Sequence, residues 1–317
     1  MRFSPIAIFL SLLFGQACSA QAQKSAQGSA SPEKVIIDTD IGDDIDDAFA
    51  IALALKSPEL EILGISTTFG DTEARAKIVD RILGEAARTD IPVLAGTPTH
   101  TTNAMTQRLY GEGGHFAKSS HPNSVDFILE QIRRYPGQIT LIAIGPLMNV
   151  GSIIDRDPQT FLKLKRVVMM GGSIERGYGD PWSPSPTPDA EWNIINDIPA
   201  AKKLFLSGVP LYLMPLDSTQ LKFDEVKRAF LFRQATPLTD ALTLLYHEWG
   251  QPTPTLFDPM TVSYILNPNI CPTQPMHIVV DDKGFTRPKP GPPNALVCLH
   301  SDSVAFFHLL ITRLSAP

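Results

Sequence analysis

The sequence predicts an α/β protein built on one open sheet, mixed but mainly parallel, with helices on both faces. Apolar runs rich in β-branched residues at 35–37, 60–69 and 139–144 predict buried strands. Segments with helical composition or spacing follow the first two runs, at 48–55 and 73–88. This alternation has no repeat period, and it favours a single sheet that is covered on both sides.

The N-terminus has the parts of a secretory signal peptide, which we place at residues 1–22. A basic start precedes the apolar run 6–14, which is too short to span a bilayer, and small residues lead to a cleavage site near Ala22. Lipid anchoring at Cys18 is the alternative, although the usual leucine of such a site is missing. Residues 23–33 are expected to form a flexible leader. We therefore expect a periplasmic or secreted protein.

Removal of that peptide leaves about 290 residues, and we expect residues 34–317 to form a single domain. An oxidising compartment would permit a bond between Cys271 and Cys298, but their spacing alone does not require one. No Cys/His cluster has the spacing of a zinc site. The net charge of −6 and the lack of a Lys/Arg run argue against nucleic acid or an anionic membrane as a partner, and we expect no membrane span.

Six aspartates lie within the ten positions 38–47, between the first strand and the first helix. In an open α/β sheet this edge of the strands is where ligands bind. The helix N-terminus offsets roughly 0.3–1 kcal/mol of repulsion per carboxylate, which is too little for this density. A divalent cation would supply the missing charge, and oxygen ligands favour Ca²⁺ or Mg²⁺ over zinc. The alternative is a solvated acidic turn in which Asp46 or Asp47 caps the helix.

The later segments continue the alternation. We expect strands at 92–96, 139–144, 166–172 and 210–215, and helices at 199–206 and 302–314. The segments 277–284 and 294–299 alternate like two paired strands, with a hairpin turn at Asp281-Asp282. Residues 110–115 are rich in glycine and are expected to form a mobile loop, without the sequence of a phosphate site. The proline-rich residues 178–188 predict a long irregular loop.

Four motifs, in order, resemble those of the nucleoside hydrolases, calcium-dependent enzymes that cleave the N-glycosidic bond of ribonucleosides. The family pattern Asp-x-Asp-x-Gly-x-Asp-Asp-Ala is similar to residues 38–48, where the loop is two residues longer. Residues 143–149 resemble the family's Ala-Ile-Gly-Pro-Leu-Thr-Asn, residues 190–193 its Ala-Glu-Phe-Asn, and Asp258-Pro259 the end of its His-Asp-Pro. The resemblance implies a nucleoside hydrolase-type, Rossmann-like fold over nearly the whole domain.

The resemblance also implies a metal site and a catalytic base. Ca²⁺ would be held by Asp40, Asp47, Asp258 and the backbone carbonyl of Met148, because a main-chain oxygen does not depend on the side chain. Asp40 would take the proton of the attacking water as general base. In the longer loop, Asp44 is an alternative to Asp46 or Asp47.

The substrate implied is a ribonucleoside, hydrolysed to ribose and free base in purine or pyrimidine salvage. Asp46 is expected to contact the 2′-hydroxyl, and Glu191 and Asn193 to anchor the sugar. Met170 is expected to pack near the ribose. Asp71 stands where the family has a sugar-binding asparagine, and it is either a substrate contact or the cap of the following helix. Relatives form dimers and tetramers, so a homo-oligomer is an open expectation.

Two departures from the family leave the base and the activity open. Phe257 replaces a histidine that contacts or protonates the leaving base, and Ser185 replaces an asparagine. A phenylalanine cannot be a general acid, so a purine leaving group needs another donor or is not activated. One alternative is a periplasmic calcium-dependent nucleoside- or sugar-binding protein without turnover. The other is a phosphatase with its nucleophile in Asp38-x-Asp40, which Gly42 disfavours.

Overall fold

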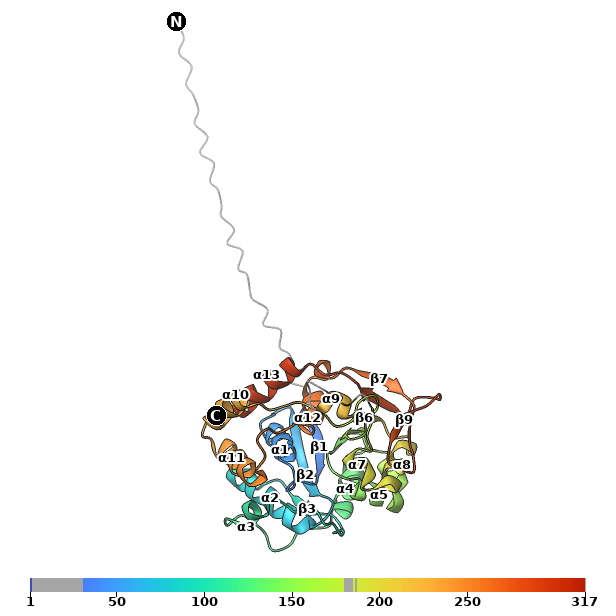
Figure 1. Ribbon diagram of the computed structural model, residues 1–317, viewed down its shortest axis with the longest axis horizontal. Helices are drawn as coiled ribbons and strands as arrows, with labels where there is room; N and C mark the ends of the chain where they lie inside the picture. Colours follow the sequence, from blue (N-terminus) through green and yellow to red (C-terminus); the bar gives the residue numbers. More distant parts are fainter. Residues whose placement is uncertain (2–30, 180–184, 186, 317) are drawn as a thin grey trace. The chain divides into compact units, whose positions relative to one another are not determined.

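Eight strands form the central sheet, in the order β3-β2-β1-β4-β5-β6-β10-β7. Figure 1 shows β1 and β2 side by side in this sheet. All neighbouring pairs are parallel except β10 and β7 at one edge. The strands are β1 (Glu33–Thr39), β2 (Leu60–Thr67), β3 (Val93–Ala95), β4 (Ile139–Ala143), β5 (Arg166–Met170), β6 (Leu211–Met214), β7 (Thr273–Met276) and β10 (Ala295–Cys298). The predicted open, mainly parallel sheet is confirmed.

The structure, a computed structural model, describes residues 1, 31–179, 185 and 187–316. The predicted signal peptide, Cys18 and most of the leader lie outside the described residues, as does part of the proline-rich loop. Pro32–Pro317 forms one compact unit. Of the helices in the described part of the chain, none has the length and apolar character to cross a bilayer.

Strand β1 lies inside the sheet and is buried on both sides. Val35 and Ile37 face the apolar core on one side, and Ile36 between them faces the core on the other. Successive side chains of a strand point to opposite faces, so a run of apolar residues is required where both faces are covered. This position explains why the sequence shows an unbroken apolar run here rather than alternation with polar residues.

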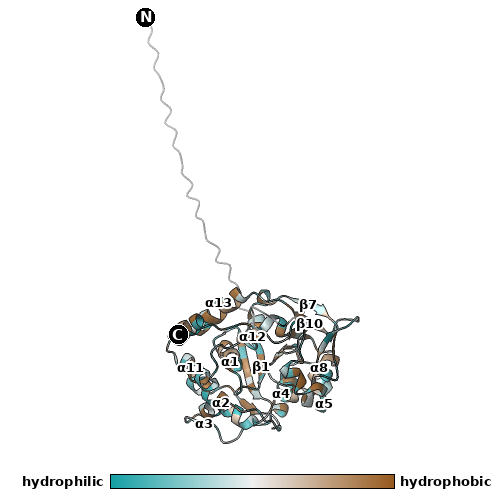
Figure 2. Ribbon diagram, viewed as in Figure 1, coloured by the Kyte–Doolittle hydropathy of each residue, from teal (hydrophilic) through white to brown (hydrophobic). Residues whose placement is uncertain are grey.

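Helices cover both faces of the sheet. The first core is closed by α1 (Asp46–Leu55), α2 (Thr72–Glu85), α11 (Pro237–Trp249), α12 (Pro259–Leu266) and α13 (Ser303–Leu314). The second is closed by α4 (Ser124–Arg134), α5 (Met148–Arg156), α6 (Pro158–Phe161) and α8 (Ile198–Leu206). Figure 2 shows both apolar and polar residues on α2, as expected for a helix with one face on the core. The short elements are α3 (Arg108–Glu112), α7 (Trp192–Ile195), α9 (Leu216–Thr219), α10 (Glu225–Phe232) and η1 (Pro268–Ile270).

The predicted pairing of 277–284 with 294–299 is wrong. Strand β8 (Ile278–Val280) pairs instead with β9 (Thr286–Pro288), and β10 pairs with β6 and β7. The predicted turn is present and explains the difference: Asp281 Oδ1 accepts hydrogen bonds from two backbone N–H groups of the turn, and Gly284 has a φ of +83°. The chain therefore reverses at once, before it reaches β10.

The predicted glycine-rich loop is in part helical. Helix α3 contains Tyr110, whose hydroxyl donates to Glu85 at 2.9 Å and whose backbone N donates to Glu248 at 3.0 Å. The guanidinium of Arg81 lies 4.1 Å from the centre of the Tyr110 ring. These contacts come from α2 and α11, so packing holds a segment whose composition alone predicts mobility.

Cys271 and Cys298 form a disulfide, which the spacing had left open. The bond joins the residue after η1 to the end of β10, and it closes a chain segment of sequence separation 27. Strand β7 lies inside that segment, at the sheet edge, where Pro275 can be accommodated because an edge strand does not need every backbone N–H.

Candidate active site

A cavity of about 360 Å³ lies at the carboxyl edge of the parallel strands. Asp40 directly follows β1, Ile144 directly follows β4, and Met170 is the last residue of β5. Its lining is Asp40, Asp43, Asp44, Asp46, Asp47, Asn103, Ile144, Met170, Tyr178, Glu191, Trp192, Asn193, Trp249, Phe257 and Asp258. Among the described residues that line it there is no Lys, Arg or His. The cavity is therefore strongly acidic, and it has the size of a small-molecule site.

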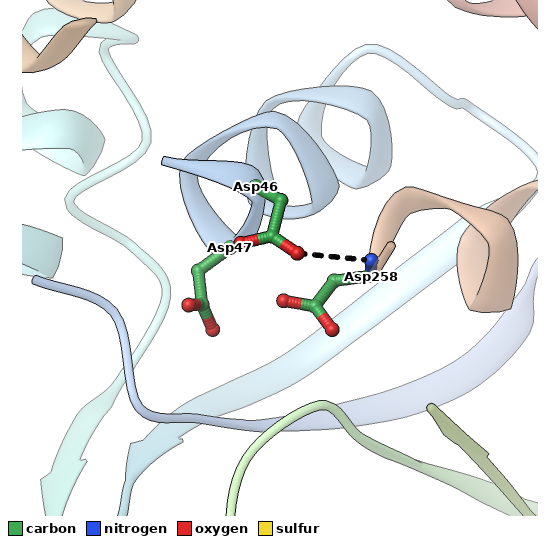
Figure 3. A group of neighbouring side chains, drawn as sticks. All are labelled: Asp46, Asp47 and Asp258. Atoms are coloured by element: carbon green, nitrogen blue, oxygen red, sulfur yellow. Dashed lines mark hydrogen bonds between the residues drawn. The ribbon is translucent and has the colours of Figure 1, made fainter. Parts of the chain in front are cut away.

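Three aspartates point toward one another in this cavity (Figure 3). Asp46 and Asp47 form the first turn of α1, and Asp258 immediately precedes α12. Each offers a carboxylate oxygen within 4.8 Å of the others, and all three side chains are buried. The backbone N of Asp258 donates to Asp46 Oδ2 at 3.4 Å across 212 residues of sequence. Two helix N-termini thus bring the group together.

The electrostatics of this group fit a hard divalent cation. Burial raises the pKa of Asp46, Asp47 and Asp258 well above the ordinary value, and the neighbouring carboxylates raise it further. Buried charges of one sign are costly unless they are paired or coordinate a metal. The donor set consists only of carboxylate oxygens, which Ca²⁺ and Mg²⁺ prefer. The residues present therefore fit a metal ion of this class.

Asp40 lies beside this group. Burial raises its pKa to about 7, while the charge of Arg75 and a hydrogen bond from the Trp192 side chain lower it. The charge of Asp40 in turn raises the pKa of Asp47 and Asp258, so the four carboxylates share one electrostatic environment. A carboxylate with a pKa near neutrality is suited to accept a proton from water.

Arg75 holds the longer acidic loop in place, and the sequence analysis missed it. This buried side chain of α2 donates to the backbone carbonyls of Phe69 at 2.7 Å and Ile41 at 2.9 Å, and also to that of Asp40. Its remaining nitrogen lies 3.0 Å from Asp43 Oδ2. Asp43 thereby pairs with Arg75, whereas Asp46 and Asp47 lie beside Asp258.

Replacing Arg75 with methionine is expected to destabilise the protein by about 3–5 kcal/mol, because the buried carbonyls and Asp43 lose their donor. Arg75→Lys should recover only part of this, since an ammonium cannot form the planar fork. Urea unfolding of each variant measures the effect. Arg88→Met is the control, because the Arg88–Asp90 pair is exposed and should contribute little. A loss below about 1 kcal/mol for Arg75→Met would contradict this role.

Glu191, Asn193 and Met170 lie together in the cavity. Glu191 caps α7, and its carboxylate accepts hydrogen bonds from the backbone N of Gly172 at 2.9 Å and of Asn193 at 3.0 Å. Burial raises the pKa of Glu191 to about 7, and these backbone donors lower it. Asn193 Nδ2 donates to the Met170 carbonyl at 3.1 Å. The three residues predicted to contact the sugar are therefore fixed by the backbone around them.

Two predicted site residues lie elsewhere. Asp71 does not line this cavity: it caps α2 by accepting from Ala74 N at 3.1 Å and pairs with Arg108 at 2.7 Å, as in the capping alternative. Met148 is not in the lining either, because it begins α5, where its carbonyl accepts from Ser152 Oγ at 2.8 Å. Ile144, directly after β4, is the residue of this motif that lines the cavity.

Four aromatic side chains line the rest of the cavity, and two of them, Tyr178 and Trp249, come from outside the motifs named in the sequence. The four are Tyr178, Trp192, Trp249 and Phe257. The ring of Tyr178 meets Phe257 edge-on with centres 6.2 Å apart, and its hydroxyl accepts a hydrogen bond from Trp192 N at 3.0 Å. Trp192 packs edge-on against Phe69, at 5.8 Å. Aromatic rings thus line the same cavity as the acidic group.

Comparison with known proteins gives a consistent result. Residues 35–308 match the family model described as inosine-uridine preferring nucleoside hydrolase. The pyrimidine-specific ribonucleoside hydrolase RihA of Salmonella gallinarum is 32% identical over 316 residues, which cover 88% of this chain and 97% of that protein. Two solved structures are similar in fold. The plant nucleoside hydrolase PpNRh1 is 27% identical with a TM-score of 0.77, over 90% of this chain and 100% of that one. The purine-preferring ribonucleoside hydrolase of Gardnerella vaginalis is 23% identical with a TM-score of 0.76, over 89% and 98%.

Proposed function

Because the chain belongs to the inosine-uridine preferring nucleoside hydrolase family, we propose that its acidic cavity hydrolyses ribonucleosides with Ca²⁺ as cofactor and Asp40 as general base. The chain is a nucleoside N-ribohydrolase, which cleaves the N-glycosidic bond to ribose and free base. The observation that carries the proposal is the convergence of Asp46, Asp47 and Asp258 beside Asp40.

The carboxylates of Asp40, Asp46, Asp47 and Asp258 would hold the cation. When bound, Ca²⁺ would supply positive charge that lowers the pKa of a water molecule and orients the two ribose hydroxyls. A substrate that lacks the 2′-hydroxyl would leave part of this site unpaired, which favours ribose over deoxyribose.

Asp40 would accept the proton of the water that attacks C1′. Asp40 lines the same cavity as the three-aspartate group, and a carboxylate next to the attacking water can accept its proton. Glu191 and Asn193 would hold the sugar, since their backbone contacts already fix their orientation. A single displacement through an oxocarbenium-like state predicts inversion at C1′.

We also propose that the mature chain works outside the cytoplasm. The signal-peptide features of residues 1–22 support this location, and the Cys271–Cys298 disulfide is compatible with it.

The test is a reducing-sugar assay with uridine, cytidine, inosine and adenosine, with and without EDTA. Release of ribose that EDTA stops and Ca²⁺ restores is the expected result. Ribose release that is unaffected by complete chelation would reject the cofactor. Thermal stabilisation by a nucleoside without any turnover would instead identify a binding protein.

A further inference from the structure

The two-stranded sheet of β8 and β9 lies outside the central sheet, but one of its side chains reaches the turn after β5. Thr286, the first residue of β9, is buried, and its hydroxyl makes two hydrogen bonds to Ser173. It accepts from the backbone N of Ser173 at 2.9 Å and donates to the backbone carbonyl of Ser173 at 2.9 Å. One side chain thus satisfies both backbone groups of a buried residue that lies 113 positions away.

The same turn carries a hydrogen-bond donor to Glu191. The backbone N of Gly172 donates to Glu191 Oε2 at 2.9 Å. Gly172 approaches the hairpin closely, since a Cβ on it would lie 2.9 Å from Thr286 Oγ1. The carbonyl of Gly172 accepts from the backbone N of Leu216 at 2.9 Å, so Thr286 and the start of α9 hold the next peptide from two sides. Neighbouring peptides are rigid planes that share a Cα, so Thr286 also fixes the peptide that binds Glu191.

The hairpin has a second contact, with helix α7. Gly284, in the turn between β8 and β9, packs against Ile195, the last residue of α7. A Cβ on Gly284 would lie 3.2 Å from the Cα and the Cβ of Ile195. Helix α7 begins directly after its cap, Glu191, and contains Asn193. The hairpin therefore contacts both the turn that binds Glu191 and the helix that carries Asn193.

Resting on the proposed function, in which Glu191 and Asn193 hold the sugar, we infer that the β8–β9 hairpin positions both residues and that Thr286 is a positioning residue for sugar binding. Thr286 acts through the turn at Gly172 and Ser173. Side chains that are already held in one orientation lose less conformational freedom when substrate binds. Because they would hold hydroxyls that do not react, they stabilise the bound substrate and the transition state alike. Loss of their order should therefore raise KM and leave kcat nearly unchanged.

Sugar binding is measured without turnover by calorimetric titration of the calcium-loaded protein with 1,4-imino-D-ribitol, a mimic of the oxocarbenium-like sugar that carries no base. Thr286→Val removes the hydroxyl and keeps a β-branched side chain. We expect the Kd for imino-ribitol to rise about 10-fold, as for a lost buried hydrogen bond, while the Kd for Ca²⁺ stays within about 2-fold. Thr286→Ser keeps the hydroxyl and should bind imino-ribitol within about 3-fold of the wild-type Kd.

Turnover gives a second measurement, with the fastest of the four ribonucleosides as substrate. We expect Thr286→Val to raise KM about 10-fold and to change kcat by less than about 3-fold. Thr160→Val is the matched control, because it removes another buried threonine hydroxyl, which donates to Asp157 Oδ2 at 2.7 Å on α6. This control should keep the wild-type KM and the wild-type Kd for imino-ribitol.

Gly284→Ala tests the other contact, because the added Cβ meets Ile195, and it should also weaken binding of imino-ribitol. This variant decides the outcome if thermal unfolding shows that Thr286→Val is not folded. Wild-type affinity for imino-ribitol in the deciding variant, or an equal loss in Thr160→Val, would overturn the inference alone. An equal loss of Ca²⁺ affinity would do the same, because it would show a general distortion. A wild-type protein that neither binds imino-ribitol nor releases ribose would overturn the proposed function itself.

Discussion

Replacing Asp40 with asparagine is expected to lower kcat for ribonucleoside hydrolysis by roughly 10²–10⁴-fold, the usual contribution of a general base. Asparagine keeps the size of the side chain and an oxygen that can bind Ca²⁺, but it cannot accept the proton of water. Single-turnover release of ribose measures the chemical step directly. The variant should stay folded, because the substitution removes a buried charge that burial disfavours.

Two controls separate loss of the base from loss of the metal. Calorimetric titration of Asp40→Asn with Ca²⁺ should still show binding, whereas Asp258→Asn, which changes a member of the three-aspartate group, should bind more weakly. Asp71→Asn should retain hydrolysis within about 3-fold, since this exposed carboxylate caps α2 outside the cavity. If Asp40→Asn kept more than a tenth of the wild-type kcat with Ca²⁺ bound, Asp40 would not be the base.

The metal-free protein is expected to lose stability as the pH rises from about 4 to 8. Burial raises the pKa of Asp40 and Glu191 to about 7 and that of Asp38 to about 6 in the folded state. The folded protein thus binds these protons more tightly than the unfolded chain. The stability that they contribute is complete below the unfolded pKa, near 4, and is lost as the pH rises through 6 to 7.

Calcium should reverse this trend, because the cation binds the ionised carboxylates. Thermal unfolding at pH 5 to 8, in EDTA and in millimolar Ca²⁺, measures both curves. We expect the midpoint in EDTA to fall by on the order of 5–10 °C between pH 5 and 8, since each pKa unit is worth about 1.4 kcal/mol. The calcium-loaded protein should show a smaller fall or none. A midpoint in EDTA that is higher at pH 8 than at pH 5 would refute the argument.

His121 also has a raised pKa, and comparing the unfolding curves with and without Ca²⁺ separates its effect from that of the cavity. Burial lowers the pKa of His121, but its bonds to Asp80 and Glu73 prevail and raise it, so His121 also stabilises the protein below its folded pKa. This histidine is tied to α2, and it contributes equally with and without Ca²⁺. The difference between the two curves therefore reports the carboxylates that bind the cation, and Asp40→Asn should reduce that difference.

The local sequence pattern was enough to predict where most strands and helices lie, because hydrophobic spacing and residue preferences depend on residues close together in the chain. The apolar run 35–37, the helix after Asp47 and the strand 139–144 lie where their composition predicts. The pairing of β8 is different, because the alternation of 294–299 is compatible with any neighbouring strand. The tight turn at Asp281 and Gly284 forms a hairpin, so β8 pairs with β9 instead of β10.

Motif resemblance extended the prediction to the site. Asp40, Asp46, Asp47 and Asp258 were all named from the sequence, and the structure brings them to one cavity. Met148 and Asp71 lie outside the lining of that cavity, and Asp71 takes the alternative role of helix cap. The motif containing Met148 was recognised, but the direction of a carbonyl depends on where helix α5 begins, and that carbonyl is used within the helix. Asp71 was pulled away from the cavity by a cap and by Arg108, which lies 37 residues further along the chain.

By itself, the sequence determined the fold class, the acidic edge and the family. Parallel strands that alternate with helices must bring their carboxyl ends to the same side, so an aspartate after one strand meets residues after another. Tertiary structure alone decided which side chains turn inward and what they meet. The sequence around Arg75 and Trp249 does not predict their roles. Arg75 is buried and Trp249 lines the cavity because of the elements that pack against them. Short-range preferences act along the chain, whereas a site is built from contacts across it.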